Sequence, residues 1–175
     1  MTNTSESNYV YKGQIINLRL DTINLRSGND KKHLREVVEH NPAVAILPID
    51  DHGNILFVRQ YRHPTKENLL EVPAGIIEEG EHPADTAMRE LQEEVGYASA
   101  NLRPLGGFWS SPGFTDEYLH CFIATSLVKS KLPEDEDEEI TIETIHKSKI
   151  AKLIKLGEIQ DAKTIAILMM AECVL

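Results

Sequence analysis

Charged residues near the middle of the chain are spaced for metal chemistry: Arg89, Glu90, Glu93 and Glu94. On a helix, Glu90 and Glu94 would lie one turn apart on the same face, with Glu93 beside both. Like charges at this spacing destabilise a helix by roughly 0.2–0.5 kcal/mol per pair. A divalent cation removes that repulsion, and Mg²⁺ accepts carboxylate oxygens. The spacing therefore indicates a metal site, with a solvated acidic helix face as the alternative.

The surrounding sequence predicts this helix and both of its ends. Proline suits the first position of a helix and glycine the position just past its end, so Pro83 and Gly96 bracket about three turns. Upstream, Gly75 and Glu81 complete a pattern of fixed spacing with the four charged residues. A generic glutamate-rich helix does not need that pattern, which therefore favours the metal site over the solvated face.

The stretch from Gly75 to Tyr97, GIIEEGEHPADTAMRELQEEVGY, resembles the signature box of the Nudix hydrolases at every fixed position. In that family the box forms a loop, a helix and a second loop, which hold Mg²⁺ against the diphosphate of a nucleoside diphosphate linked to another moiety. Water then cleaves the diphosphate. The resemblance implies two or three Mg²⁺ ions, with Mn²⁺ as an alternative. It implies metal ligation by Glu90, Glu94 and the backbone carbonyl of Ala74, a ligand or outer contact from Glu93, and orientation of these glutamates by Arg89.

Nearly the whole chain, from about Tyr11 onward, is similar to the ADP-ribose pyrophosphatase branch, notably at LFVRQYRHP, LLEVPAG, SSPGFTDEY and GEIQDAKTI. The most diagnostic mark is Pro112, sixteen residues after Gly96, which in this family indicates a preference for ADP-ribose. An ordinary tight turn is the alternative, since Pro-Gly makes one in any protein. The resemblance implies substrate contacts from Ser111, Pro112 and Gly113, and a contact of Glu117 with the terminal ribose.

Two arginines follow apolar strands and suit a diphosphate, because the planar guanidinium fork matches phosphate oxygens. The resemblance implies that Arg62 contacts the substrate in its own active site and that Arg35 reaches the site of a neighbouring subunit. Ordinary surface arginines are the alternative. The resemblance also makes Ile76 a residue that lines the site through its backbone.

Six acidic residues in succession, EDEDEE, occupy positions 134–139. A solvated acidic loop is the usual explanation of such a run. In relatives of the family, a loop at this place supplies a further metal ligand and a general base, which the resemblance assigns to Glu138 and Glu136. Because six acids are adjacent, a shift of one residue stays open.

Composition limits the class of protein. The chain has 175 residues, enough for one domain with a full core, and its net charge of −10 argues against nucleic acid and acidic membranes as partners. Cys121 and Cys173 lie in apolar sequence and are expected to be free thiols in a reducing compartment. Residues 1–8 lack a signal-peptide profile, and the apolar stretch from Ile165 is interrupted by Glu172 and too short to span a bilayer. We expect a soluble, cytoplasmic protein.

Hydrophobic periodicity predicts strands interspersed with three helices, which indicates an α/β sandwich with a mixed β-sheet. The resemblance implies that this is the Nudix-type α/β/α sandwich. Residues 1–40 would form an N-terminal antiparallel β extension, and residues 41–175 the Nudix hydrolase domain. The resemblance implies that the extension is exchanged between the subunits of a homodimer. The predicted strands are 15–25, 33–40, 43–50, 54–61, 69–72, 102–109, 117–125 and 140–145, and the predicted helices are 83–95, 146–159 and 161–175.

These observations together predict a Mg²⁺-dependent enzyme that hydrolyses ADP-ribose, a small-molecule nucleoside diphosphate sugar, to AMP and ribose 5-phosphate. The first alternative is a pyrophosphatase for another nucleotide sugar such as GDP-mannose. A second alternative, from a different class, is a non-catalytic ADP-ribose sensor. The intact set of glutamates argues against the sensor, because binding alone does not need so many metal ligands.

Overall fold

The computed structural model describes residues 3–24, 32–133 and 139–172 of a chain that divides into two compact units. The first unit is Met1–Pro42 with Trp109–Tyr118, and the second is Ala43–Phe108 with Leu119–Leu175. The elements are β1 (Asn3–Lys12), β2 (Ile16–Asn24), β3 (Lys32–His40), β4 (Ala43–Pro48), β5 (Asn54–Arg62), β6 (Glu67–Glu71), β7 (Ala74–Ile76), α1 (Pro83–Glu94), β8 (Tyr97–Trp109), β9 (Tyr118–Lys129), β10 (Ile140–His146), η1 (Lys147–Lys149), α2 (Ile150–Leu156) and α3 (Ala162–Glu172).

The first unit contains an antiparallel sheet of three strands in the order β1-β2-β3. Its strands β2 and β3 match the predicted strands 15–25 and 33–40, whereas the sequence does not predict β1, because residues 3–8 carry no apolar side chain. The segment after β8 is tied to β3. The amide of Val38 donates to the carbonyl of Phe114 at 2.7 Å, and the amide of Asp116 donates to the carbonyl of Val38 at 3.3 Å.

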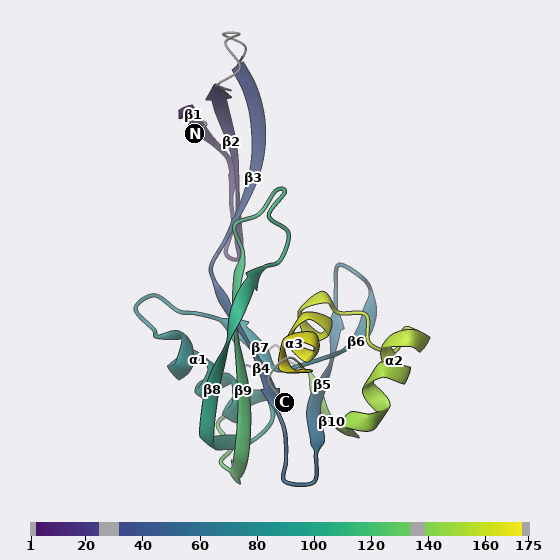
Figure 1. Ribbon diagram of the computed structural model, residues 1–175. Coiled ribbons are helices and arrows are strands. Elements are labelled where there is room, and N and C mark those ends of the chain that lie inside the picture. Colours follow the sequence, from purple (N-terminus) through teal and green to yellow (C-terminus); the bar gives the residue numbers. More distant parts are fainter. Residues whose placement is uncertain (1–2, 25–31, 134–138, 173–175) are drawn as a thin grey trace. The chain divides into compact units, whose positions relative to one another are not determined.

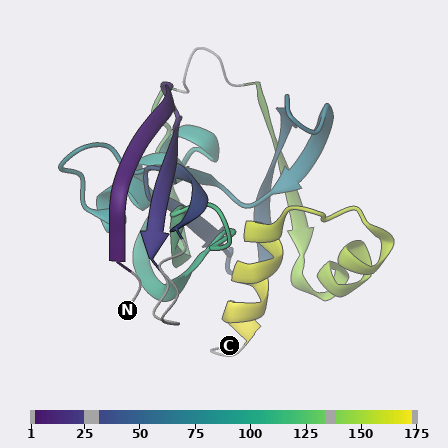
Figure 2. The ribbon, with the colours of Figure 1, turned by 90° about the horizontal axis from the view of Figure 1, so that it is seen from above.

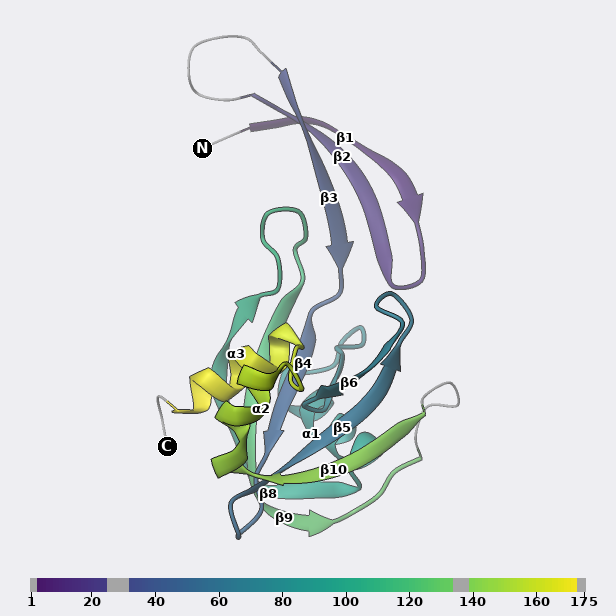
Figure 3. The ribbon, with the colours of Figure 1, turned by 90° about the vertical axis from the view of Figure 1, so that its right-hand side faces the viewer.

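The second unit contains two sheets. The first has the order β7-β4-β9-β8 and is mixed, because β4 runs parallel to β9 and antiparallel to β7. The second sheet has the order β10-β5-β6 and is antiparallel, and Figure 3 shows its three strands side by side. The predicted mixed sheet is therefore present, with β4 at its centre.

Helices cover both faces of the mixed sheet, and the sequence of β4 shows why. All six residues of β4 are buried, and alternate side chains point to opposite faces. Ala43, Ala45 and Leu47 pack in one apolar cluster with residues of α3, whereas Val44 and Ile46 pack in another with residues of α1. Figure 1 shows α1 and α3 on opposite sides of β4. This arrangement confirms the predicted α/β/α sandwich.

The chain ends in two helices separated by a break, as predicted (Figure 2). Gly157 follows α2 with a φ of +75°, a conformation that glycine adopts without a steric cost. Among the described residues, no helix is both long enough and apolar enough to cross a membrane. Cys121 is a buried free thiol, as expected, and burial raises its pKa to about 11; Cys173 lies outside the described residues.

Candidate active site

Helix α1 lies where the sequence predicts it, with both predicted ends. Pro83 is its first residue, and the imidazole of His82 caps it by accepting a hydrogen bond from the amide of Ala84 at 3.3 Å. Gly96 follows the last turn with a φ of +76°. These local signals place Glu90, Glu93 and Glu94 on the last turns of a rigid element.

Two of these glutamates are buried on the face of α1 that packs against the core. Glu90 is 9% exposed and Glu94 is 3% exposed, and Leu91 between them is fully buried. A buried carboxylate is costly unless hydrogen bonds or cations compensate it. The amide of Ala74 donates to Glu94 Oε2 at 3.2 Å. The structure therefore brings together Ala74 on β7 and Glu94 on α1, which the sequence predicts as metal ligands.

Gly75 explains how Glu90 fits beside β7. A Cβ atom on Gly75 would lie 1.9 Å from Glu90 Oε1 and 2.0 Å from its carboxyl carbon. The Glu90 carboxylate thus occupies space that any larger residue at position 75 would fill. Glycine at position 75 lets the Glu90 carboxylate approach the backbone of β7. This contact depends on the tertiary structure, so the sequence pattern alone does not reveal it.

Arg89 binds three carboxylates at once. Its Nη1 donates to Glu90 Oε1 at 2.7 Å and to Glu93 Oε2 at 2.8 Å, while Nε and Nη2 both contact Glu81 at 3.1 Å. The hydrogen bond from Arg89 is the main reason that the pKa of Glu81 falls to about 2, and that hydrogen bond also contributes most to the raised pKa of Arg89. Glu81, which has no predicted role, therefore anchors the arginine that orders Glu90 and Glu93.

Ile76 lies at the edge of the same cluster. Its side chain is exposed, and its carbonyl oxygen lies 3.5 Å from Arg89 Nη2. The backbone of Ile76 therefore lies beside the arginine that holds the glutamates. Its predicted role, to line the site through its backbone, stays a prediction.

Arg62 is held by Glu71, whose role the sequence does not predict. Its Nε and Nη2 donate to the two carboxylate oxygens of Glu71 at 2.9 and 2.8 Å, and Lys163 also binds Glu71. The negative charge of Glu94 adds to the raised pKa of Arg62, after the larger effect of Glu71, so Arg62 lies within electrostatic reach of the acid cluster. Glu71 and Lys163 belong to the segments LLEVPAG and GEIQDAKTI, which resemble the ADP-ribose pyrophosphatase branch. That resemblance is the sequence signal that could have identified the two residues.

The remaining described candidates belong to the first unit. Ser111, Pro112 and Gly113 form a turn, in which the carbonyl of Ser111 accepts hydrogen bonds from the amides of Phe114 and Thr115, both at 3.1 Å. Glu117 has an oxygen 3.8 Å from His40 Nδ1. Arg35 is exposed on β3, and its Nη1 donates to the carbonyl of Leu34 at 2.9 Å. Glu136 and Glu138 lie outside the described residues.

A divalent metal fits the donor set in the second unit. Within residues 3–24, 32–133 and 139–172, no three acidic, histidine or cysteine side chains form a complete metal centre. The oxygen donors that are present suit a hard cation: the carboxylates of Glu90 and Glu94 and the carbonyl of Ala74. The cradle between Gly75 and Glu90 keeps one of these carboxylates beside β7.

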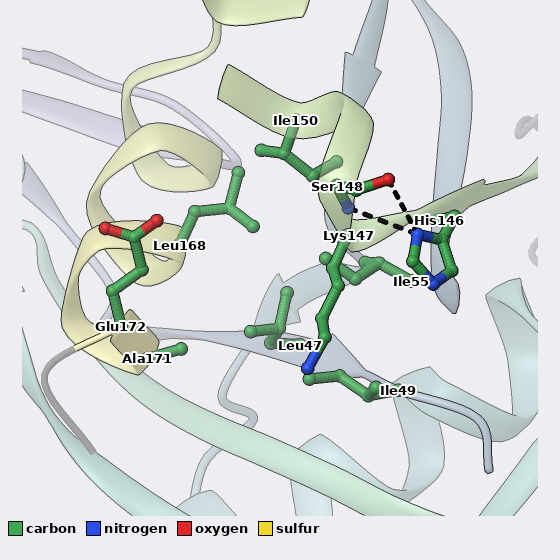
Figure 4. Close-up of a pocket in the computed structure, with 10 residues that line it drawn as sticks. All are labelled: Leu47, Ile49, Ile55, His146, Lys147, Ser148, Ile150, Leu168, Ala171 and Glu172. Atoms are coloured by element: carbon green, nitrogen blue, oxygen red, sulfur yellow. Dashed lines mark hydrogen bonds between the residues drawn. The ribbon is translucent and has the colours of Figure 1, made fainter. Parts of the chain in front are cut away.

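The second unit also has a cavity of about 440 Å³, whose lining residues are drawn in Figure 4. Aliphatic side chains from both sheets of the unit and from α3, among them Leu47, Ile55 and Leu168, form its wall, and Lys147 and Glu172 are exposed members of its lining. None of the predicted site residues lines it. The chemistry indicated by α1 and β7 therefore lies elsewhere in the unit.

Two buried glutamates on a helix that packs against a mixed sheet, with one carboxylate against Gly75 of β7, offer oxygen donors of the kind that a divalent cation accepts. The sequence pattern described as NUDIX domain matches residues 39–166. The chain belongs to the NUDIX family, which confirms the family that the sequence predicts.

Named relatives cover most of the chain. It is 40% identical over 157 residues to "ADP-ribose pyrophosphatase" of Bacillus subtilis (strain 168), covering 89% of this chain and 84% of the relative. It is 37% identical over 164 residues to "Methanol dehydrogenase activator" of Bacillus methanolicus, covering 93% and 88%. It is 31% identical over 156 residues to "GDP-mannose pyrophosphatase" of Yersinia enterocolitica serotype O:8 / biotype 1B (strain NCTC 13174 / 8081), covering 83% and 81%.

A solved structure has the same fold. The "Crystal structure of ADP compounds hydrolase" superposes with a TM-score of 0.88 at 22% identity, covering 98% of this chain and 92% of that one. This similarity confirms the fold predicted from the sequence.

Proposed function

We propose that this protein hydrolyses the diphosphate of ADP-ribose to AMP and ribose 5-phosphate in a Mg²⁺-dependent reaction. The observation that carries the proposal is the buried pair Glu90 and Glu94, held against Ala74 and Gly75 of β7 in a NUDIX chain. The 40% identity to a protein named ADP-ribose pyrophosphatase supports the substrate.

The residues of α1 and β7 would prepare the site for the metal. Glu90, Glu94 and the carbonyl of Ala74 would hold Mg²⁺, which supplies an activated water and neutralises negative charge that develops on the phosphoryl oxygens. Arg89 keeps Glu90 and Glu93 in fixed orientations through hydrogen bonds of 2.7 and 2.8 Å. Rigid positioning of this kind lowers the barrier, because the groups need not reorganise during reaction.

Other residues would bind the substrate and move a proton. Arg62 would bind the diphosphate, Glu117 would accept hydrogen bonds from the terminal ribose, and the backbone around Ile76 would line the site. A carboxylate of the acidic run, Glu136 in our assignment, would take the proton of the attacking water, and Glu138 would add a metal ligand. The turn Ser111–Gly113 would complete the ribose side, and Arg35 would come from a second subunit.

GDP-mannose is the runner-up substrate, because a protein named GDP-mannose pyrophosphatase is 31% identical over 156 residues. ADP-ribose is favoured by the higher identity to its named pyrophosphatase and by Pro112. A non-catalytic sensor of ADP-ribose is disfavoured, because the site buries two carboxylates that binding alone does not require.

A substrate panel tests the proposal. The purified protein is incubated with Mg²⁺ and ADP-ribose, GDP-mannose, diadenosine polyphosphates or nucleoside triphosphates, and the products are identified. We expect ADP-ribose to have the highest kcat/KM, with AMP and ribose 5-phosphate as products and no turnover in EDTA. A tenfold advantage for GDP-mannose, about 1.4 kcal/mol of transition-state discrimination, would assign the protein to the runner-up.

A further inference from the structure

The buried carboxylate of Glu71 joins three elements of the second unit. Glu71 ends β6 and is 1% exposed. It accepts two hydrogen bonds from Arg62 at the end of β5, at 2.9 and 2.8 Å, and a third from Lys163 on α3. The bidentate contact fixes the plane of the guanidinium as well as its position.

This contact leaves part of Arg62 accessible. The guanidinium has five N–H donors in a rigid fork, and Glu71 binds the edge formed by Nε and Nη2. The Arg62 side chain is 38% exposed although its partner is almost fully buried. Glu71 therefore holds one edge of the guanidinium inside the protein, and the exposed part of the side chain remains available to an anion.

Lys163 allows Glu71 to remain charged while it is buried. Its Nζ binds Glu71 and also lies 3.1 Å from Asp161 Oδ2. Burial by itself would raise the pKa of Glu71, but the hydrogen bonds and charges of Arg62 and Lys163 outweigh burial, and its pKa is lowered. A single cation against two carboxylates would leave charge uncompensated, so Arg62, Lys163, Glu71 and Asp161 together form a neutral set.

The start of α3 also holds the backbone that connects β6 to β7. The Thr164 hydroxyl accepts a hydrogen bond from the amide of Val72 at 2.9 Å and donates to Asp161 Oδ2 at 2.6 Å. Val72 directly follows Glu71 and lies two residues before Ala74. The same helix end thus holds both the partner of Arg62 and the backbone that approaches Glu94.

We propose that Glu71 and Lys163 are positioning residues, which hold the guanidinium of Arg62 in the orientation that binds the substrate diphosphate. This inference rests on the proposed function, in which Arg62 binds the diphosphate. Neither residue needs to touch the substrate. Their effect reaches it through Arg62.

Steady-state kinetics provides the first test. Glu71→Gln keeps the size of the side chain but loses the charge and places an amide N–H₂ against Arg62 or Lys163. We expect KM for ADP-ribose to rise by about tenfold or more, because a hydrogen bond to a charged group is lost, while kcat changes much less. Lys163→Met should raise KM in the same direction, and Lys163→Arg should restore most of the affinity.

The matched control is Glu143→Gln. Glu143 also pairs with an arginine of β5, Arg59, but the two side chains are 36% and 33% exposed and have no proposed role in the site. We expect this variant to keep the KM of the wild-type protein. Equal KM effects of Glu71→Gln and Glu143→Gln would overturn the inference.

A double-mutant cycle separates positioning from simple stabilisation. The dissociation constant of α,β-methylene-ADP, whose diphosphate bridge resists hydrolysis, is measured by calorimetry for Arg62→Gln, Glu71→Gln and the double variant. Positioning predicts that Glu71→Gln weakens binding only while Arg62 is present. A lower melting temperature with unchanged binding and KM would make the pair merely structural and overturn the inference.

The same data separate this inference from the proposed function. If the cycle shows the predicted coupling in analogue binding but the wild-type protein does not cleave ADP-ribose, the result would contradict the proposed reaction and support the positioning role. If the protein cleaves ADP-ribose but the effects of Arg62→Gln and Glu71→Gln on analogue binding are additive, the result would support the proposed reaction and contradict the positioning role. If Glu71→Gln does not fold, Lys163→Met and Lys163→Arg decide by the same two measurements.

Discussion

Glu94 is 3% exposed, and an ionised carboxylate in such a buried position has to be compensated by hydrogen bonds, nearby positive groups or a cation. One oxygen accepts a hydrogen bond from the amide of Ala74 at 3.2 Å. A residue chosen for stability alone would be apolar at this position, like Leu91 beside it. The choice of an acid therefore indicates chemistry, and it can be tested without destroying the packing.

We expect Glu94→Gln to lose about 100-fold or more in kcat, because a neutral amide cannot replace the charge that binds the metal. The amide oxygen of glutamine can still accept from Ala74, and one buried charge disappears, so the melting temperature should stay the same or rise. Turnover at saturating Mg²⁺ and thermal unfolding are measured on the same preparation. Wild-type turnover in this variant would show that Glu94 is not a metal ligand.

Glu81 predicts how stability depends on pH. Its pKa falls from an ordinary 4.5 to about 2, mainly through the hydrogen bond from Arg89. A carboxylate with a lowered pKa in the folded state stabilises the protein above its ordinary pKa, and this contribution is lost as the pH falls from about 4.5 to about 2. We expect Glu81→Gln to have a smaller free energy of unfolding than the wild-type protein at pH 7. On acidification, its free energy of unfolding should fall less than that of the wild-type protein.

Urea unfolding at pH 7, 4 and 3 measures this difference, and Glu79→Gln serves as the control because Glu79 is an exposed residue of the same loop. The control should follow the wild-type pH dependence. If the free energy of unfolding changes equally between pH 4 and 3 for Glu81→Gln and for the wild-type protein, the stabilising role of the Arg89–Glu81 contact would be contradicted.

At the scale of elements, strand β7 and helix α1 fit together because Gly75 has no side chain. A Cβ on Gly75 would lie 1.9 Å from Glu90 Oε1, at the far end of a flexible side chain. Gly75→Ala should therefore fold, because the Glu90 carboxylate can move aside. Turnover should fall by about 100-fold, since a displacement of about 1 Å in a catalytic group has effects of that size.

Gly80→Ala is the opposite case and serves as the comparison. Gly80 has open space around its Cα but a φ of +84°. Alanine in that conformation costs roughly 1–2 kcal/mol, so this variant should lose stability and keep its turnover. Loss of stability without loss of turnover in Gly75→Ala would contradict the close contact with Glu90.

The elements also show which parts of the structure can be predicted from sequence. Helix α1 is predictable because its signals, Pro83 and Gly96, are local and lie within the helix or next to it. Strand β7 is not, because its three residues carry no period of their own and pair with β4 through backbone contacts. Strand β8 begins at Tyr97 rather than at residue 102, so tertiary pairing extends it beyond the apolar run.

The candidate site divides in the same way. The spacing of Glu90, Glu93 and Glu94 follows from helix geometry and is visible in the sequence. The contact of Arg62 with Glu71 is not visible in the sequence, because it joins the ends of two strands. Lys163, the second cation that binds Glu71, lies 92 residues from it in the chain. Side-chain partners that meet only through the fold give no periodic signal.

On the scale of the whole molecule, the first unit exposes apolar side chains that a partner could cover. Tyr9, Val10, Tyr11, Ile15 and Leu34 are each between 48% and 66% exposed. Monomeric proteins rarely leave many such side chains in one region uncovered. We expect an obligate homodimer in which the N-terminal strands contact the partner subunit and Arg35 completes its site. Light scattering at micromolar concentration tests this, and a monomer would contradict it.

Subunit exchange tests the trans role of Arg35 separately. Arg35→Ala and Glu94→Gln are each expected to be nearly inactive as homodimers. In a mixed dimer with Arg35 acting in trans, one site carries both changes and the other carries neither, so activity should partly return. Native mass spectrometry confirms the exchange. Mixed dimers without recovered activity would place Arg35 in the site of its own subunit.

The parallel pairing of β4 with β9 has a consequence for the newly made chain. Ala43 pairs with Leu119, so the central strand of the mixed sheet lacks this neighbour until roughly 75 further residues have been synthesised. At about 5–20 residues per second on the ribosome, that interval lasts about 4–15 s. During this interval the wholly apolar strand AVAILP lacks β9, which is one of its two neighbours in the folded sheet. We expect nascent chains that end before β9 to bind chaperones, and chains that extend beyond it to be released.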